Sequence, residues 1–270
     1  MKNFQLVVVA LVAILGFNSC SNQFESNNEK KLVKYVCVDD TNFKLLEQSI
    51  EYNEKGQAIS IQDDHYFADD EYSLGVHQFN WNENSIDATQ NLSIKLFSDD
   101  VSNQTINYTI TLENNRFTKF EYDVKNAISN YTYDKEGRMQ TYVDAISDAT
   151  CVWDADKLIS INNAYYNTEH KFTYTYENIS CVKGYCPIII KNIQTEPLPF
   201  AHPEFVGLRT KQCPISVEYT YFEGDEPVGT DHYSYEYEFD NEGYITKIIE
   251  TIKIQDEDIL HIQTYTLTWE

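Results

Sequence analysis

The chain has few basic residues, few prolines and, beyond its first residues, no long apolar run. Only 20 Lys and Arg stand against 43 Asp and Glu, which gives a formal net charge of -23. Nucleic-acid binding needs basic side chains that face phosphates, so this excess of acid argues against a nucleic-acid partner. No apolar run after Phe17 is long enough to cross a membrane as a helix, and no window has the period of an amphipathic helix. The 6 prolines are nearly absent from the alternating segments, as hydrogen-bonded strands require.

The motifs of common enzymes and cofactor sites are also lacking. The sequence has no Gly-x-Ser-x-Gly elbow, no phosphate-binding glycine loop, no His-Glu-x-x-His pair and no Cys-x-x-Cys pair. Apart from His65, the histidines occur singly, which is typical of structural residues: His77, His170, His202, His232 and His261. The sequence therefore predicts no catalytic residue and no cofactor.

The N-terminus indicates export. Lys2 precedes an apolar run from Leu6 to Phe17 that is too short for a spanning helix but suits the core of a signal peptide. Asn18-Ser19-Cys20 follows, and this arrangement resembles the lipobox of bacterial lipoproteins, whose cysteine is acylated. We expect a signal peptide over residues 1–19, a lipid on Cys20 that holds the protein to the membrane, and a polar tether over residues 20–31. An ordinary secretory signal with an incidental Cys20 is the alternative; the lipoprotein interpretation predicts an outer membrane protein that faces the periplasm or the cell surface.

Cysteine usage leaves an odd number of thiols after Cys20, namely Cys37, Cys151, Cys181, Cys186 and Cys213. Cys181 and Cys186 flank Val182 to Tyr185, a segment short enough to be a hairpin loop with both sulfurs across its neck. We therefore predict a disulfide between Cys181 and Cys186. In this interpretation Ile188 to Ile193 and Ile215 to Tyr221 pair as a hairpin, which places Cys213 far from Cys186.

A short unit recurs along the chain, in which an aromatic residue is followed by Asn, Asp or Glu and often by Gly. Its fullest copy runs from Tyr131 to Tyr142 and predicts a β-hairpin with a turn at Asp134 to Gly137. Tyr233, Tyr235, Tyr237 and Phe239 alternate with polar residues, as on a strand with one buried face. We predict an all-β, mostly antiparallel meander of repeated hairpins, roughly a dozen or more strands, curled into an open, barrel-like sheet as one domain over residues 32–270. The other copies end in Tyr52-Asn53, Trp81-Asn82, Trp153-Asp154, Tyr176-Glu177 and Phe239-Asp240.

The lipobox and the Tyr-Asp-x-x-Gly-Arg-Met unit at Tyr133 to Met139 are together similar to a family of Bacteroides-type lipoproteins of unknown function. That family is described as having a porin-like β-fold, so the resemblance implies such a fold over most of residues 31–270. The unit also resembles the tyrosine-aspartate repeats of large bacterial shell-forming proteins, but Arg138 occurs in only one copy here. Neither resemblance implies a catalytic residue.

Two segments are candidates for ligand contact. Asp63, Asp64, Asp69 and Asp70 could supply oxygen ligands to calcium, although they lack the alternating pattern of a known calcium loop, so a solvated acidic turn is the alternative. The Pro-rich segment from Thr195 to Gln212 forms a long apolar loop that either faces a ligand or plugs the open end of the sheet. Its candidate ligand-facing residues are Leu198, Phe200, Phe205 and Leu208.

The 21 Tyr and 3 Trp form either a stacking platform for sugars or the packing of the sheet itself. Lys191, Glu218 and Lys253 fall in expected strands, which argues against a barrel with an apolar lipid-facing girth. The sequence predicts a lipid-anchored, non-catalytic binding or assembly module of the cell envelope, whose partner is a glycan, an apolar ligand or an envelope protein. The alternative is an envelope hydrolase acting on a glycan or another extracellular substrate.

Overall fold

The computed structural model describes residues 29–68, 70–96, 100–123, 127–165, 168–191, 197–224, 226–255 and 260–270. The predicted signal peptide, Cys20 and Asp69 lie outside these residues. The described chain is almost entirely strand. Its strands are β1 (Leu32–Asp39), β2 (Lys44–Tyr52), β3 (Ala58–Ala68), β4 (Glu71–Trp81), β5 (Ser85–Lys95), β6 (Ser102–Glu113), β7 (Arg116–Tyr122), β8 (Ile128–Tyr133), β9 (Met139–Val143), β10 (Ser147–Asp154), β11 (Lys157–Tyr165), β12 (Thr168–Ser180), β13 (Gln212–Glu223), β14 (Glu226–Phe239), β15 (Ile245–Lys253) and β16 (Leu260–Trp269).

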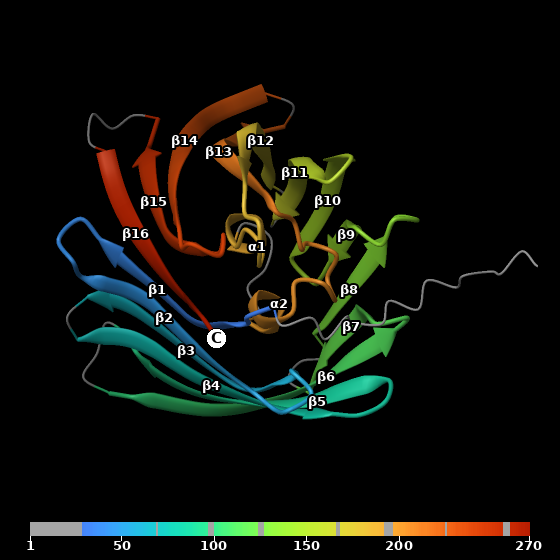
Figure 1. Ribbon diagram of the computed structural model, residues 1–270. Coiled ribbons are helices and arrows are strands. Elements are labelled where there is room, and N and C mark those ends of the chain that lie inside the picture. The colour runs from blue at the N-terminus through green and yellow to red at the C-terminus, as the bar shows by residue number, and fades with distance from the viewer. Residues whose placement is uncertain are drawn as a thin grey trace, which may run out of the picture.

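These strands form one closed barrel. Each strand pairs antiparallel with the next along the chain, and β16 pairs with β1 to close the ring (Figure 1). The predicted antiparallel meander is confirmed, but the sheet is closed rather than open. Pairs such as Cys37 with Tyr265 join its two ends, and closure leaves no strand edge unpaired.

The connection from β12 to β13 turns into the barrel. We call its described residues, 181–191 and 197–211, the plug; it contains the short helices α1 (Ile188–Lys191) and α2 (Leu198–Ala201), which lie within the ring of strands (Figure 1). The hairpin predicted for Ile188 to Ile193 with Ile215 to Tyr221 is wrong, because β13 pairs with β12 and β14 instead. Three consecutive isoleucines have no strand alternation, and as a helix all three are fully buried inside the barrel.

The plug fills one end of the barrel, which we call the plugged end. Plug residues form hydrogen bonds with backbone amides at the starts of odd-numbered strands. At the start of β7, the Phe117 amide donates to the Phe205 carbonyl at 3.0 Å. The ring Nε2 of His202 lies 3.0 Å from the Ala58 amide. The opposite end, where β1 turns into β2 and β13 into β14, is the open end.

Three of the recurrent turns share one hydrogen-bond pattern at the plugged end. The Asp134 carboxylate accepts from the amides of Glu136 and Arg138 at 3.0 and 2.9 Å, and Gly137 has a φ of 77°. A short acceptor side chain followed by a residue in the left-handed region is what such a tight turn needs. The turns at Asn53 to Gly56 and Asp240 to Gly243 repeat this pattern.

The aromatic residue of the repeat forms a second recurring hydrogen bond. The Trp153 indole on β10 donates to the Met139 carbonyl at the start of β9, at 2.7 Å. An aromatic side chain near the plugged end of an even-numbered strand thus donates a hydrogen bond to a backbone carbonyl at the start of the preceding strand. The aromatic residue of the repeat therefore has a structural role in joining neighbouring strands. The same bond joins Tyr52 to Leu32, Trp81 to Ala58, Tyr133 to Phe117, Tyr176 to Leu158, Tyr237 to Pro214 and Trp269 to Ile245.

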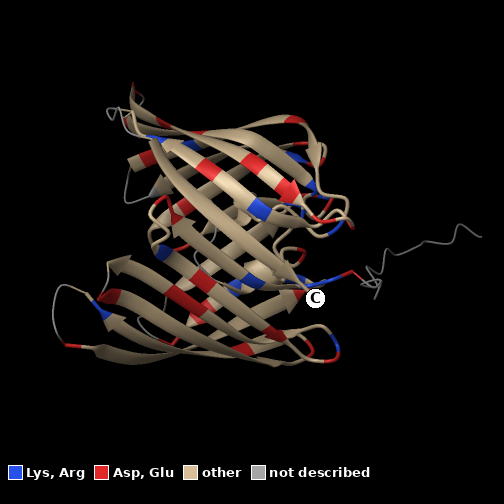
Figure 2. Cartoon of the chain, turned by 60° about the vertical axis from the view of Figure 1, so that its left-hand side comes forward, with Lys and Arg blue, Asp and Glu red and all other residues tan. Residues whose placement is uncertain are grey.

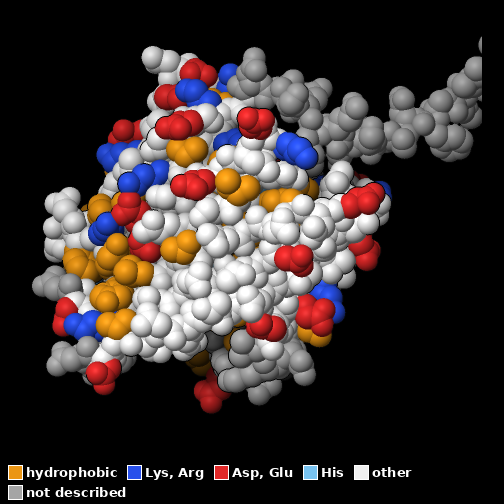
Figure 3. Space-filling model, turned by 90° about the horizontal axis from the view of Figure 1, so that it is seen from below, with side chains coloured by type: hydrophobic (Ala, Val, Ile, Leu, Met, Phe, Trp, Pro, Cys, Tyr) orange, Lys and Arg blue, Asp and Glu red, His pale blue; other side chains and the backbone are white. Residues whose placement is uncertain are grey.

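Acidic and basic residues are spread along the strands of the barrel (Figure 2). From below, charged side chains are spread over the visible face and hydrophobic ones gather in one part of it (Figure 3). Neither short helix in the described part of the chain has the length or the apolar run that a membrane crossing requires. Outward side chains of β5 and β6 bond in pairs: Thr89 with Asn107 (3.0 Å), Asn91 with Thr105 (3.0 Å) and Ser93 with Asn103 (2.7 Å).

Candidate functional site

Aromatic side chains line the inner wall towards the open end on β12, β13 and β14. His170, Phe172, Tyr219, Tyr221 and Tyr233 share the inward strand face with buried Tyr174 and Val217, yet all five remain partly exposed. Side chains inside a closed barrel contact solvent only if solvent enters through an end, and the plug occupies the other end. We call these five residues the aromatic shelf.

The rings of the aromatic shelf support one another. Tyr219 stacks on Phe172 with centroids 4.7 Å apart and on His170 at 5.5 Å. The Tyr219 hydroxyl lies 2.6 Å from Nδ1 of His170. Burial lowers the pKa of His170 and raises that of Tyr219, so both groups are neutral near pH 7. The shelf therefore offers uncharged ring faces with polar atoms at their edges.

A partly buried ion pair joins α1 of the plug to β15 of the barrel wall. Nζ of Lys191, the last residue of α1, donates to both carboxylate oxygens of Glu250 at 2.9 and 2.7 Å. The Tyr265 hydroxyl also donates to Glu250, at 2.7 Å, and Tyr35 stacks on Tyr265 with centroids 5.4 Å apart. The Glu250 side chain is 0% exposed while that of Lys191 is 32% exposed, which places the ammonium at the boundary between plug and solvent. Burial raises the pKa of Tyr265 well above its ordinary value, so its hydroxyl stays a donor.

A second polar cluster lies on the inner wall of β2, β3 and β4. Asp63 accepts from Gln48 at 2.8 Å and lies 3.3 Å from Nε2 of His65. Burial opposes ionisation of Asp63, but bonds from His65 and Gln48 hold its pKa below the usual value, while the Asp63 bond raises the pKa of His65. Burial lowers the pKa of His77 to about 4, and its Nδ1 lies 3.1 Å from the Tyr108 hydroxyl.

Three atoms of this inner wall are buried without a hydrogen-bond partner in the described structure: the Tyr35 hydroxyl, Oε1 of Gln48 and Nε2 of His77. Tyr35 pairs directly with Gln48 across β1 and β2, so two of these atoms belong to neighbouring inward side chains. Buried polar atoms usually find a partner, and an unpaired one costs free energy. In the described structure, side chains of the wall therefore leave these donor and acceptor atoms without a hydrogen bond.

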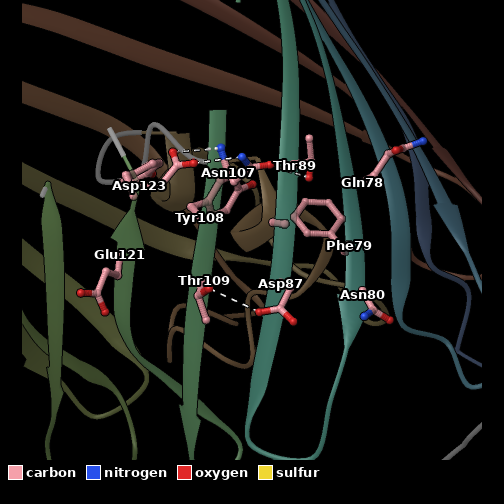
Figure 4. Close-up of a pocket in the computed structure, with 12 residues that line it drawn as sticks. Gln78, Phe79, Asn80, Asp87, Thr89, Asn107, Tyr108, Thr109, Glu121 and Asp123 are labelled. Atoms are coloured by element: carbon pink, nitrogen blue, oxygen red, sulfur yellow. Dashed lines mark hydrogen bonds between the residues drawn. The ribbon is translucent and has the colours of Figure 1, made fainter. Parts of the chain in front are cut away.

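A shallow trough of about 680 Å³ lies on the outer face of β4 to β7 (Figure 4). Its outward side chains form two cross-strand rows. Asn107 donates to Asp123 at 2.9 Å, and Thr109 donates to Asp87 at 3.3 Å, so neighbours already hold these carboxylates. The rows are Gln78, Thr89, Asn107 and Asp123, then Asn80, Asp87, Thr109 and Glu121.

Two solved structures of porin-like proteins are similar to this barrel. The one from Bacteroides uniformis has a TM-score of 0.59 and 12% sequence identity, and the match covers 88% of this chain and 98% of that chain. The fold is porin-like. The one from Bacteroides vulgatus has a TM-score of 0.47 and 13% identity, over 90% of this chain and 99% of that chain. No family model and no curated protein matches the sequence.

The likeness confirms the porin-like fold implied by the sequence resemblance, and at 12% identity it shows the fold alone. Membership of a lipoprotein family stays a prediction.

The porin-like barrel separates the predicted metal ligands. Asp63 bonds Gln48 on the inner wall, whereas Asp64, the next residue of β3, faces the other way and accepts from Gln62 at 2.6 Å. Consecutive strand residues point to opposite faces, so the expected convergence of Asp63 and Asp64 on calcium is wrong. The alternative of a solvated acidic turn holds for the exposed Asp70 and not for Asp63 and Asp64, which lie in β3. Asp70 lies by itself in the β3 to β4 turn, 3.3 Å from Nζ of Lys95, and Asp69 is outside the described residues.

The predicted ligand-facing loop is part of the plug. Leu198 and Leu208 are fully buried, and Phe200 and Phe205 are at most 8% exposed. These side chains face the packed core at the plugged end, so they are not available to a ligand from solvent. The expectation that they face a ligand is wrong, because the loop covers its apolar residues with the barrel wall.

The predicted hairpin around Cys181 and Cys186 is also wrong. The amides of these residues donate to the carbonyls of Lys211 and Thr210, both at 2.9 Å, on the segment that returns to β13. The two cysteines therefore do not face each other across a neck. All five described cysteines are buried free thiols.

Sequence reasoning missed the aromatic shelf and the Lys191 to Glu250 pair. The alternation of Tyr219 and Tyr221 with Glu218 and Thr220 was a visible signal for an inward aromatic face. No local pattern shows which stretch of that face the plug leaves open.

Proposed function

We propose that this protein is a lipid-anchored, non-catalytic binding module of the outer membrane, and that its ligand enters the barrel through the open end. The observation that carries the proposal is the aromatic shelf, whose rings stay partly exposed on the inside of a barrel closed at its other end. Buried apolar residues of the plug fill the plugged end, so the barrel suits holding a ligand better than passing one through.

The position of the chain start fits a tether at the plugged end. Glu29 accepts from the Gly184 amide at 3.0 Å and pairs with Arg209, both in the plug. A lipid on Cys20 would hold the plugged end towards the membrane and leave the open end facing away from it. The outward polar rows of β4 to β7 support this arrangement, because a barrel that spans a membrane needs an apolar outer band.

The chemistry of the shelf favours a ligand with flat apolar faces and polar edges, which describes a glycan. Aromatic faces stack on the apolar face of a sugar ring, and the hydroxyls of Tyr219, Tyr221 and Tyr233 can bond its hydroxyl groups. A purely apolar ligand or a segment of an envelope protein would use the same rings without those bonds.

The test is a binding titration of the full chain in detergent with hexasaccharides of glucose, xylose and N-acetylglucosamine, and with an apolar naphthalene dye as the fourth probe. We expect one probe to bind, and Tyr219→Ala to weaken that binding about tenfold, since a lost stacking contact costs about 1.4 kcal/mol. Thr220→Ala is the matched control, because Thr220 is the next residue of β13 and bonds Thr230 on the outer face. Equal losses from both variants, or no binding of any probe, would contradict the proposal.

The second candidate is a hydrolase, and the polar cluster around Asp63 favours it. Asp63, His65 and His77 have displaced pKa values and lie on one inner wall, as at many catalytic sites. If the wild type cleaves a hexasaccharide and Asp63→Asn does not, the protein is a hydrolase, and the proposal of a non-catalytic binding module is wrong.

A further inference from the structure

Three buried thiols meet at the neck of the plug, where the chain leaves β12 and returns to β13. The Sγ atoms of Cys181 and Cys213 lie 3.5 and 3.6 Å from the same acceptor, the Lys211 carbonyl oxygen. Ser180 pairs with Gln212, and the Cys181 amide donates to Lys211 at 2.9 Å, so backbone bonds hold the two segments side by side. Cys181 and Cys213 are therefore neighbours on antiparallel segments.

Cys186 is the third thiol of this group. Its amide bonds the Thr210 carbonyl at 2.9 Å, and its Sγ lies 3.9 Å from the Tyr237 hydroxyl. The neighbouring Cys181 and Cys186, followed by burial, raise the pKa of the Cys213 thiol, so both lie close to it. The exposed fractions are 2% for Cys181 and 0% for the other two, so the group is sealed once the plug is in place.

We propose that Cys181 and Cys213 form a disulfide as the chain folds in an oxidising compartment, and that this bond fastens the two ends of the plug to each other. The register sets Cys181 opposite Lys211 and makes Cys213 its diagonal neighbour, and both thiols reach the same carbonyl oxygen. Closing the bond therefore draws the two segments together until the Cβ atoms reach the separation of a disulfide. Cys186 remains a thiol beside Cys213 and is the residue that takes over the bond when Cys181 is lost.

The oxidant is a disulfide, either of a small thiol or of a thiol oxidase. The Cys181 thiolate attacks one sulfur of that disulfide and releases the first thiolate, leaving a mixed disulfide on Cys181. The Cys213 thiolate then attacks the Cys181 sulfur and releases the second thiolate. Two electrons pass to the oxidant, and the two protons from the cysteines end on its released thiols.

The closed bond would join the two ends of the plug where the chain leaves β12 and returns to β13. The loop that it closes contains both α1 and α2. A disulfide that closes a long loop lowers the conformational entropy of the unfolded chain. Oxidation should therefore raise the unfolding temperature by several degrees.

Peptide mapping tests the bond directly. Trypsin cuts after Lys183, Lys191 and Lys211, which places Cys181, Cys186 and Cys213 in three different peptides. The reduced, denatured full chain is refolded with glutathione and its disulfide, blocked with an alkylating reagent and digested without reduction. We expect the Cys181 peptide joined to the Cys213 peptide, with Cys186, Cys37 and Cys151 alkylated.

Two variants sharpen the test. Cys186→Ser should keep the Cys181 to Cys213 bond, whereas Cys181→Ser should give a Cys186 to Cys213 bond, because Cys213 is the shared neighbour. Three alkylated thiols in the wild type, a Cys181 to Cys186 bond, or a Cys186 to Cys213 bond in the presence of Cys181 would overturn the proposal. Refolding in vitro keeps these outcomes independent of where the protein resides and of what it binds.

Discussion

His77 is a buried histidine on the inner wall, and its burial in the neutral form makes the barrel less stable as the pH falls. Burial lowers its pKa from 6.5 to about 4, so the folded barrel holds it uncharged where the unfolded chain would protonate it. The unfolded state gains a proton first as the pH falls, and stability is lost between about pH 6.5 and pH 4. The full shift corresponds to about 3 kcal/mol.

We measure the free energy of unfolding in urea at pH 7 and at pH 4.5. We expect its decrease between the two pH values to be about 2 kcal/mol smaller for His77→Gln than for the wild type. His65 has a raised pKa, so its contribution is present at low pH and is lost as the pH rises through that value; it opposes the effect of His77. His232→Gln is the control, since the His232 side chain is 55% exposed on the outer face. If wild type and His77→Gln lose stability equally, the burial of a neutral His77 does not govern the acid response.

At the scale of elements, the plug is held by a close backbone contact to a wall turn. Gly207 has a φ of 66°, and a Cβ there would lie 2.5 Å from the Gly137 carbonyl oxygen and 2.7 Å from the Met139 amide. Neither backbone atom can move without breaking the turn between β8 and β9. Gly207 is therefore required both by its conformation and by the space it leaves.

Gly224→Ala is a matched control for this contact, because Gly224 has a φ of 62° and nothing lies within 4 Å of its Cβ position. We expect Gly224→Ala to cost about 1 kcal/mol from the left-handed backbone alone. Gly207→Ala should cost at least about 2 kcal/mol more, from the overlap with the turn, when both are measured by urea unfolding. Equal costs would mean that the plug does not dock rigidly on this turn.

The hairpins and their turns could be predicted from the sequence because their signals are local. Asp134 and Gly137 lie within one turn and fix its geometry together, and the aromatic residue before each turn bonds the neighbouring strand. The plug could be predicted only in part: plugging was one of two alternatives for residues 195–212, and a strand was expected where α1 lies. The isoleucines of α1 have the same apolar run as a buried strand, and only the space inside a closed barrel decides between the two.

The candidate site was missed for a related reason. Lys191 and Glu250 are far apart in the sequence, and their pairing depends on how deep the plug enters. The half-exposed rings of the aromatic shelf follow an alternation that was recognised on β14, but their access to solvent is set by the plug as well. The predicted Asp63 and Asp64 site failed because the acidic stretch is a strand rather than a loop.

At the scale of the whole molecule, the core of the barrel is rich in aromatic residues, and its outer face carries polar rows together with exposed apolar side chains such as Val76 and Val152. Membrane-spanning barrels carry a continuous apolar band on the outer face, where it contacts lipid. Outward residues of this barrel, such as Asn107, Thr109 and Glu121, suit contact with water instead. In the proposed function, the interior is the surface on which a ligand finds apolar contact, and the lipid predicted on Cys20 supplies the membrane attachment.

Cell fractionation of the Cys20→Ala variant tests most directly whether the barrel stands in water on a lipid tether. We predict that the wild type is found in the membrane fraction and that Cys20→Ala moves to the soluble fraction with an unchanged β-sheet circular dichroism spectrum, since acylation supplies the anchor. Cys151→Ala, which alters a buried wall thiol, is the control and should stay in the membrane fraction. A folded Cys20→Ala variant that remains in the membrane fraction after washing at high salt would contradict the lipid-tethered barrel.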